Sequence, residues 1–412
     1  MLSNEISRRA NDSSVLRFFS NPILTVIAVA SFLMLLLASY PAQAATETIL
    51  YNFTCAASDG CYPQAGVILD SSSNLYGTTQ NGGAYGWGTV FKLSTSGTLT
   101  ILHSFNPSAG DGFYPQAGVV FGPNGNLYGT TEAGGTYGGG TIYMVTPSGT
   151  ETVLYNFTGS TDGCEPFAGV VFDSEANLYG TATYCGADGW GTVFMLSPSG
   201  TFTTLHSFTG GTDGGYPLAG LLLGPGKSGN LYGTTYQGGS DGFGTVFKVT
   251  SSGTETVLHS FNANGKDGFY PQAGLVPGSS SSVIGTTAQG GAVGVGTVFE
   301  VSVSGKETII YSFRAGKDGR TPLTGIVSTG TDEGCGVTWY GGTSDLGTVY
   351  CGNTSGTETV LHSFTHNGKD GYNPQGPLAL DKSGNLYGTT TSGGNSTACG
   401  VYGCGTVFKI VP

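Results

Sequence analysis

Four motifs decide the fold: Gly88-Thr-Val-Phe-Lys-Leu93, Ile101-Leu-His-Ser-Phe105, Asp111-Gly-Phe-Tyr-Pro-Gln-Ala-Gly118 and Asn126-Leu-Tyr-Gly-Thr-Thr131. They recur in this order along the chain. The threonine of the first motif falls at seven positions, 51 to 58 residues apart: Thr89, Thr141, Thr192, Thr245, Thr297, Thr348 and Thr406. A fixed period of this length, roughly 40 to 50 residues, that holds several short apolar segments is typical of a propeller.

Each repeat contains four short apolar segments, seen most clearly at residues 117–121, 126–131, 140–145 and 151–157. Gly, Pro, Asn and Ser bound these segments, and such residues form the turns between antiparallel strands. We name the four predicted strands A to D, with A innermost. The sequence therefore predicts an all-β protein, a seven-bladed β-propeller of four-stranded antiparallel blades.

The two ends of the repeat region predict how the ring closes. The region begins with a D strand at residues 47–53 and ends with a C strand at residues 405–410. If the last blade lacks its own outer strand, the N-terminal strand can supply it, which removes an open sheet edge. We therefore expect residues 47–53 to pair with residues 405–410.

The first 44 residues have the composition of a signal peptide. Three arginines precede an apolar segment at residues 23–38, and Ala42-Gln43-Ala44 resembles a cleavage site. The apolar segment is short for a spanning helix, which needs about 20 residues. We expect residues 1–44 to be a cleaved signal peptide, with an uncleaved anchor as the alternative, and residues 45–412 to be the propeller.

Charge and cysteine content limit the partners and the compartment. The formal net charge is −12, and no cluster of Lys and Arg interrupts the repeats. Binding to nucleic acid or to an anionic membrane surface requires such clusters, so we expect neither as a partner once the signal is cleaved. We expect the protein to be a monomer. Eight cysteines in an exported chain indicate disulfides. The blade layout favours four local pairs, although the sequence leaves other pairings open: Cys55–Cys61, Cys164–Cys185, Cys335–Cys351 and Cys399–Cys404.

The candidate ligand site lies where each A strand begins. Because successive strands alternate in direction, the D–A and B–C loops share one face, and these longer loops are where function is expected. Aromatic and amide side chains that suit a sugar ring recur there, namely Tyr62, Gln64, Tyr114, Gln116, Tyr216, Tyr270, Gln272, Asn373 and Gln375. Trp87 and Trp190 in the B–C loops extend this surface. In the alternative interpretation, Tyr-Pro only starts the strand and the glutamines line the channel with water.

Other repeated polar residues have structural interpretations. The His-Ser pairs of the D strand begin at His103, His206, His259 and His362, and adjacent strand residues face opposite ways, so they cannot act as base and nucleophile. His366 is the one unrepeated histidine. We interpret the aspartates of the Asp-Gly pairs as turn residues rather than a Ca²⁺-binding ring: Asp59, Asp111, Asp162, Asp213, Asp267, Asp318 and Asp370. We interpret the Thr-Thr and Gly-Thr hydroxyls as cross-strand pairs within a blade. We expect neither a metal nor a cofactor.

The ordered motifs Asn-Leu-Tyr-Gly-Thr-Thr, Gly-Gly, Gly-Thr-Val-Phe-Lys-Leu and Leu-His-Ser-Phe resemble the GloVer tandem-repeat family over residues 46–412. The resemblance implies a β-propeller and an exported bacterial protein, and it implies no activity. Two departures stand out. The chain ends at Pro412 without the C-terminal anchor frequent in the family, and blade six has Glu333-Gly-Cys-Gly-Val-Thr338 in place of its B motif, which leaves that strand uncertain.

These observations favour a secreted or envelope protein that acts as a binding or scaffold module for an extracellular glycan or protein. One alternative is a glycan-cleaving lyase or hydrolase with its site at the channel mouth. Glycosidic chemistry usually needs two carboxylates, and Glu165 is the only acid at the start of an A strand, which weakens that alternative. A second alternative is a purely structural surface protein.

Overall fold

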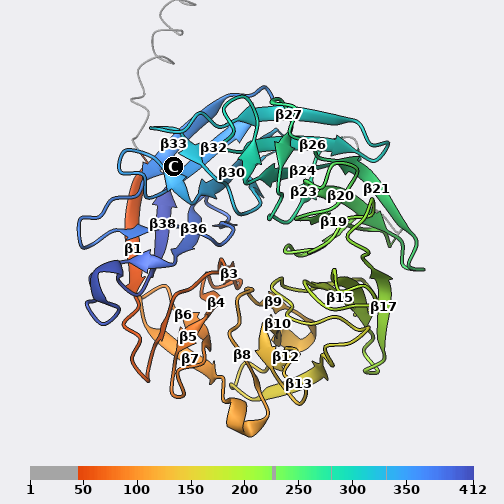
Figure 1. Cartoon of the computed structure of the whole chain (residues 1–412). Helices are drawn as coiled ribbons and strands as arrows, with labels where there is room; N and C mark the ends of the chain where they lie inside the picture. The colour runs from red at the N-terminus through yellow and green to blue at the C-terminus, as the bar shows by residue number, and fades with distance from the viewer. Residues whose placement is uncertain (1–44, 225–228, 280, 331) are drawn as a thin grey trace, which may run out of the picture. The chain divides into compact units, whose positions relative to one another are not determined.

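The computed structural model describes residues 45–412 except 225–228, 280 and 331. The predicted signal peptide lies outside the described residues. Residues 45–412 form one compact unit, in which seven four-stranded antiparallel sheets are arranged around a ring (Figure 1). The predicted seven-bladed β-propeller is thus confirmed. No helix among the described residues is long and apolar enough to cross a membrane.

The first four blades, from inner to outer strand, are β3 (Ile68–Leu69), β4 (Leu75–Thr79), β6 (Thr89–Leu93) and β7 (Leu99–Ser104); β9 (Val120–Phe121), β10 (Leu127–Thr131), β12 (Thr141–Val145) and β13 (Glu151–Asn156); β14 (Val171–Phe172), β15 (Leu178–Ala182), β16 (Thr192–Leu196) and β17 (Phe202–Ser207); and β18 (Leu222–Leu223), β19 (Leu231–Thr235), β20 (Thr245–Val249) and β21 (Glu255–Ser260). The last three are β23 (Val276–Pro277), β24 (Ser282–Thr287), β26 (Thr297–Ser302) and β27 (Glu307–Ser312); β29 (Val327–Ser328), β30 (Glu333–Thr338), β32 (Thr348–Asn353) and β33 (Glu358–Ser363); and β35 (Ala379–Leu380), β36 (Leu386–Thr390), β38 (Thr406–Val411) and β1 (Thr46–Asn52).

The ring closes through the N-terminal strand, as predicted. Strand β1 pairs antiparallel with β38, from Thr46 opposite Val411 to Asn52 opposite Thr406, and Figure 1 shows the two strands side by side. The backbone N–H of Phe53 extends this pairing by donating to the carbonyl of Gly405 at 3.0 Å. The last blade therefore has four strands although the chain supplies only three from its C-terminal end.

The innermost strands are shorter than predicted, because their first residues serve the neighbouring blade. Strand β9 covers Val120–Phe121 rather than residues 117–121, and the carbonyl of Ala117 accepts the hydroxyl of Thr78 from the preceding blade at 2.8 Å. Thr389 donates in the same way to Ala65 at 2.7 Å, which joins the last blade to the first. The first threonine of the Thr-Thr pair thus bonds across blades, which corrects the prediction that all these hydroxyls pair within a blade.

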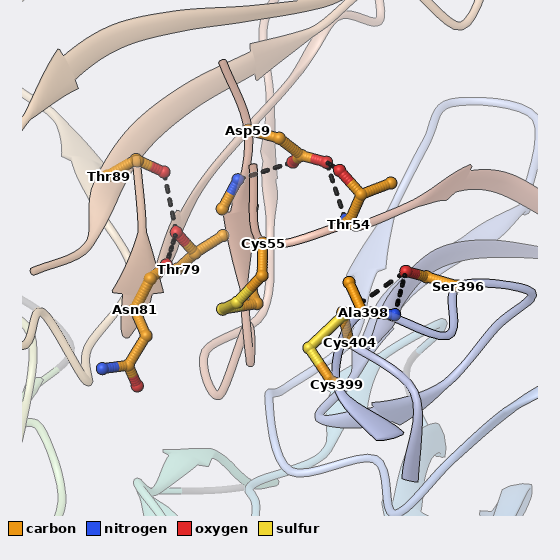
Figure 2. Close-up of a disulfide and its surroundings, with 12 residues drawn as sticks. Thr54, Cys55, Asp59, Thr79, Asn81, Thr89, Ser396, Ala398, Cys399 and Cys404 are labelled. Carbon is orange, nitrogen blue, oxygen red and sulfur yellow. Dashed lines mark hydrogen bonds between the residues drawn. A yellow bond between two sulfur atoms is a disulfide. The ribbon is translucent and has the colours of Figure 1, made fainter. Parts of the chain in front are cut away.

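The second threonine does pair within its blade. The hydroxyls of Thr79 and Thr89 lie 2.8 Å apart between β4 and β6, and Figure 2 shows this pair. Both side chains are fully buried. A buried hydroxyl without a partner is costly, so the recurrence of threonine at both positions follows from mutual satisfaction.

The strand that the sequence left uncertain in blade six is present. Strand β30 covers Glu333–Thr338 and places Cys335 opposite Cys351 in β32. All four predicted local disulfides form: Cys55–Cys61, Cys164–Cys185, Cys335–Cys351 and Cys399–Cys404. Figure 2 shows Cys55 near the Cys399–Cys404 bridge, where the first and last blades meet. Four disulfides are typical of an oxidising compartment outside the cytosol.

Candidate functional site at the channel mouth

One face of the ring carries both classes of longer loop, as predicted. Two-stranded ladders join the D–A loop to the B–C loop in five blades: β2 (Gly60–Cys61) with β5 (Asn81–Gly82), β8 (Gly112–Phe113) with β11 (Ala133–Gly134), β22 (Gly268–Phe269) with β25 (Gln289–Gly290), β28 (Gly319–Arg320) with β31 (Tyr340–Gly341), and β34 (Gly371–Tyr372) with β37 (Ser392–Gly393). Isolated bridges, Cys164 to Tyr184 and Gly215 to Gln237, do the same in the other two blades.

A proline recurs in the D–A loop of all seven blades, and the residue directly before it has a left-handed backbone. The φ angles of these residues lie between 52° and 59°, at Tyr62, Tyr114, Glu165, Tyr216, Tyr270, Thr321 and Asn373. Two backbone hydrogen bonds hold this conformation. At Tyr114, the N–H donates to Trp87 of the preceding blade and the carbonyl accepts from Glu132 of its own blade, each at 3.1 Å. Such a conformation costs on the order of 1 kcal/mol or more in a non-glycine residue, so the fold fixes these side chains in place.

The structure divides the predicted ligand set into two groups. The amides Gln64, Gln116, Gln272 and Gln375 line the central channel, a cavity of about 540 Å³. The tyrosines Tyr62, Tyr114, Tyr216 and Tyr270 do not line this cavity, nor does Asn373, whose side-chain amide donates to the carbonyl of Trp339 at 3.1 Å. Four blades therefore place an amide in the channel, whereas Phe167, Leu218 and Leu323 line it in the other three, and the larger predicted side chains lie outside this cavity.

The tyrosines at the mouth pack against aromatic side chains of the B–C loops. Ring centroids lie 5.3 Å apart for Trp87 and Tyr114, and 4.6 Å apart for Trp190 and Tyr216. Tyr270 contacts Phe243 at 5.7 Å. Trp87 remains 37% exposed, so an aromatic surface faces solvent on the loop face.

Two acids, an amide and two aromatic side chains gather on blades two to four. We call Gln116, Glu132, Glu165, Tyr184 and Tyr216 the mouth cluster. The Gln116 side-chain amide donates to the Glu132 carboxylate, and the rings of Tyr184 and Tyr216 lie 5.2 Å apart. Burial raises the pKa of Glu165, and the nearby charge of Glu132 raises it further.

Tyr184 links the acids of the mouth cluster to its aromatic side. Burial raises the pKa of its phenol, followed by the charge of Glu165 and then by Tyr216 and Glu132. The ring of Phe167, which lines the channel, lies 5.9 Å from Tyr184. With 37% of its surface exposed, Tyr184 offers an open aromatic face within electrostatic range of two carboxylates.

Sequence reasoning missed Glu132 and Tyr184. Glu132 directly follows a Thr-Thr pair, and the seven blades have six different residue types at that position: Gln80, Glu132, Thr183, Tyr236, Ala288, Trp339 and Thr391. The strands on either side of this position are nearly the same in every blade. Variation at this one position therefore indicates that folding does not fix the residue there. Four of the five histidines, by contrast, lie on outer strands, and Ser104 accepts from the backbone N–H of Ala84 at 3.3 Å rather than from His103.

The fold and the loop face define a repeat protein of the β-propeller class. The family model of the Gloeobacter/Verrucomicrobia repeat matches residues 37–227 and 223–408, and the chain belongs to this family. No curated protein matches the chain in sequence.

Solved structures share the fold at low identity. A puromycin hydrolase has a TM-score of 0.51 and 13% identity over 81% of this chain and 50% of its own. A gluconolactonase from Xanthomonas campestris has a TM-score of 0.43 and 10% identity over 91% and 92%. A luciferin-regenerating enzyme has a TM-score of 0.44 and 11% identity over 89% and 95%. At these identities the likeness describes the fold alone.

Proposed function

We propose that this protein is an exported bacterial binding module that holds an extracellular glycan on the mouth cluster. The observation that carries the proposal is the exposed ring of Tyr184, which lies against Tyr216 and within electrostatic range of the Glu132 and Glu165 carboxylates. Sugar rings offer apolar C–H faces that stack on aromatic rings, and hydroxyls that donate to carboxylates. The cluster provides both kinds of contact, and its Gln116 also lines the central channel, a cavity of about 540 Å³.

A glycan-array screen of residues 45–412, which form a compact unit by themselves, tests the proposal. The screen is run with and without Ca²⁺. We expect at least one glycan to be retained, and Tyr184→Ala combined with Tyr216→Ala to weaken that retention at least tenfold, since a stacked aromatic contributes about 0.5–1.5 kcal/mol beyond area burial. Retention that persists in this double variant would place binding elsewhere on the protein.

Blade six supplies a matched control. Tyr340 is also 37% exposed, but the Arg320 guanidinium covers its ring, 4.6 Å away, and neutralises the nearby Asp345 carboxylate by an ion pair. Tyr340→Ala should therefore leave glycan retention unchanged. The other outcome of the screen is that no glycan is retained. If an envelope protein is then captured, and its capture is lost in Tyr184→Ala, that protein replaces the glycan as the ligand of this face.

The pairing of Glu132 and Glu165 favours a second function, cleavage of the bound glycan. A carboxyl with a raised pKa can donate a proton to a leaving group while a second carboxylate acts as base or nucleophile. Glu165 has such a raised pKa, from burial and from Glu132. If the protein is a hydrolase, Glu165→Gln abolishes turnover of a retained glycan; if it is only a binder, the same variant retains the glycan and the wild type releases no product.

A further inference from the structure

Three junctions between neighbouring blades, away from the channel mouth, repeat one set of side chains. Each set joins a histidine of an outer strand, the aspartate of the loop that follows, and a glutamate at the start of the next outer strand around the ring. One nitrogen or oxygen of each residue lies within 4.8 Å of the others in its set, and the sets are His103, Asp111 and Glu151; His259, Asp267 and Glu307; and His362, Asp370 and Glu47.

The spacing within a set fits a small cation. The Nε2 atom of His259 lies 3.2 Å from Oδ2 of Asp267 and 4.0 Å from Oε1 of Glu307. Zinc holds nitrogen and oxygen ligands at about 2.0–2.2 Å, which places tetrahedral ligands roughly 3.4 Å from one another. Shifts of a few tenths of an ångström therefore suffice to bring all three atoms onto one ion.

Buried carboxylate oxygens in these sets have no partner. The Asp267 side chain is only 4% exposed, yet its Oδ1 atom accepts no hydrogen bond, and neither does Oε1 of Glu307. Oδ1 of Asp370 and Oε1 of Glu47 are in the same condition at the ring closure. An unpaired buried carboxylate is costly. Unpaired Oε1 atoms also occur at Glu151, Glu255 and Glu358, but among the described residues the unpaired buried aspartate oxygens are only those of Asp267 and Asp370, each beside a histidine, and they point to a missing positive charge there.

No protein side chain other than the histidine supplies that charge. Across residues 45–224, 229–279, 281–330 and 332–412, the ion pair between Arg320 and Asp345 is the only one that involves lysine or arginine.

We propose that each of these three sets binds a divalent first-row transition cation, such as Zn²⁺, and so clamps consecutive outer strands together. Imidazole with carboxylates suits Zn²⁺ and its neighbours, whereas Ca²⁺ and Mg²⁺ prefer oxygen ligands alone. On binding, the histidine keeps its proton on Nδ1, and its Nε2 lone pair faces the ion in place of the hydrogen bond to the aspartate. Water completes the coordination.

The other junctions support this assignment. A fourth histidine, His206, lies 3.3 Å from Asp213, and Glu255 begins the next outer strand. Where tyrosine replaces histidine at Tyr155, the glutamate position holds Phe202, whose ring stacks on the tyrosine with centroids 3.9 Å apart. At every junction with a histidine on the outer strand, a glutamate thus begins the next outer strand. At the junction of Tyr155 and Phe202, a stacked aromatic contact replaces the histidine and the glutamate.

Calorimetric titration of the chelator-treated protein with Zn²⁺ tests the proposal. We expect saturable binding of three ions, or four if His206, Asp213 and Glu255 also close, and a rise of several degrees in Tm. Titration with Ca²⁺ should give neither. Co²⁺ should bind with the same stoichiometry and give the visible absorption of a nitrogen- and oxygen-ligated site. All described cysteines are in disulfides, so thiolates do not contribute to this signal.

Two substitutions assign the ions to the junctions. Glu307→Gln should lower the stoichiometry by one, and Glu151→Gln, at a separate junction, should do the same. The matched control is Glu358→Gln, because Glu358 faces a junction with Tyr311 instead of histidine, so its stoichiometry should not change. The absence of saturable Zn²⁺ binding, or a stoichiometry that neither test substitution lowers, would overturn the proposal and leave proton sharing between the carboxyls as the account of these sets.

Discussion

At the scale of single residues, Glu358 makes the stability of the propeller depend on pH without histidine. It begins β33 and is half-buried, and burial raises its pKa to about 7, with Asp318 raising it further and Arg314 opposing the shift. Tyr311 donates its hydroxyl to Asp318 at 2.9 Å, and the buried hydroxyl of Tyr350 has no partner. These four side chains are the charged and titratable groups that act on Glu358.

The sign of the effect follows from the direction of the shift. A carboxyl whose folded pKa exceeds its unfolded pKa binds a proton more firmly in the folded state, so its stabilisation is complete below about pH 4.5 and is lost as the pH rises through about 7. After allowance for partial exposure, we expect about 1–2 kcal/mol. Glu358→Gln should therefore reduce the drop in the free energy of unfolding between low and high pH by this amount. Denaturant midpoints of chelator-treated protein at pH 5 and pH 8 measure it, and parallel pH curves for wild type and variant would contradict it.

At the scale of elements, the junction of blades five and six shows what the repeat loses when two positions change. Strand β24 has Ile284 and β29 has Ser328 where the blade-one and blade-two junction has Tyr76 and Phe121, whose rings lie 5.2 Å apart. A cavity of about 210 Å³ opens here, lined by both replacements. It occupies the space that the aromatic pairs Tyr76–Phe121 and Tyr128–Phe172 fill at two other junctions.

Restoring the pair should stabilise the protein. We expect Ile284→Tyr with Ser328→Phe to fill the cavity and raise the free energy of unfolding by on the order of 1–2 kcal/mol, since removal of a void outweighs moderate repacking strain. Thermal unfolding measures the gain. The reverse exchange at an intact junction is Tyr128→Ile with Phe172→Ser. It removes two rings whose centroids lie 4.9 Å apart and should lower Tm. An unchanged or lower Tm in the filled variant would show that the junction cannot accept the rings.

Most of this element-scale order can be predicted from the sequence. Strand positions and ring closure follow from a strict repeat, because hydrogen-bonded ladders impose the same spacing in each blade. The repeat also places each cysteine within a blade or loop, which favours the local disulfide pairs without excluding others. The role of Thr78 cannot be predicted in this way: it bonds to the next blade while its neighbour Thr79 bonds within its own, and only the packing of two blades decides between them. The mouth cluster is equally hidden, since Glu132, Glu165 and Tyr184 come from separate loops that left-handed turns bring together.

At the scale of the whole molecule, we ask whether the pairing of β1 with β38, which closes the ring, is a weak point of the fold. Phe53 follows the N-terminal strand and Phe157 follows β13 at the same position of the repeat. Both are fully buried. Phe53 meets Phe91 with ring centroids 5.4 Å apart, and Phe157 meets Phe194 at 5.3 Å. The two side chains therefore occupy equivalent positions, although Phe157 also meets Phe202 with ring centroids 5.8 Å apart and Phe53 packs in a cluster with Cys61 and Cys404. Only Phe53 follows a strand that pairs with the opposite end of the repeat region.

Each substitution to alanine should cost about 3–5 kcal/mol through the cavity it leaves. If β1 is held as firmly as a strand inside the ring, Phe53→Ala and Phe157→Ala lower the denaturant midpoint equally, because the blades unfold as one cooperative unit. If the closure frays before the rest unfolds, Phe53 is already lost from the core at the transition, and Phe53→Ala costs much less than Phe157→Ala. Unfolding followed by intrinsic fluorescence, with hydrogen exchange of the β1 amides as the second probe, distinguishes the two, and we expect the equal outcome because β1 pairs with β38 along its whole length.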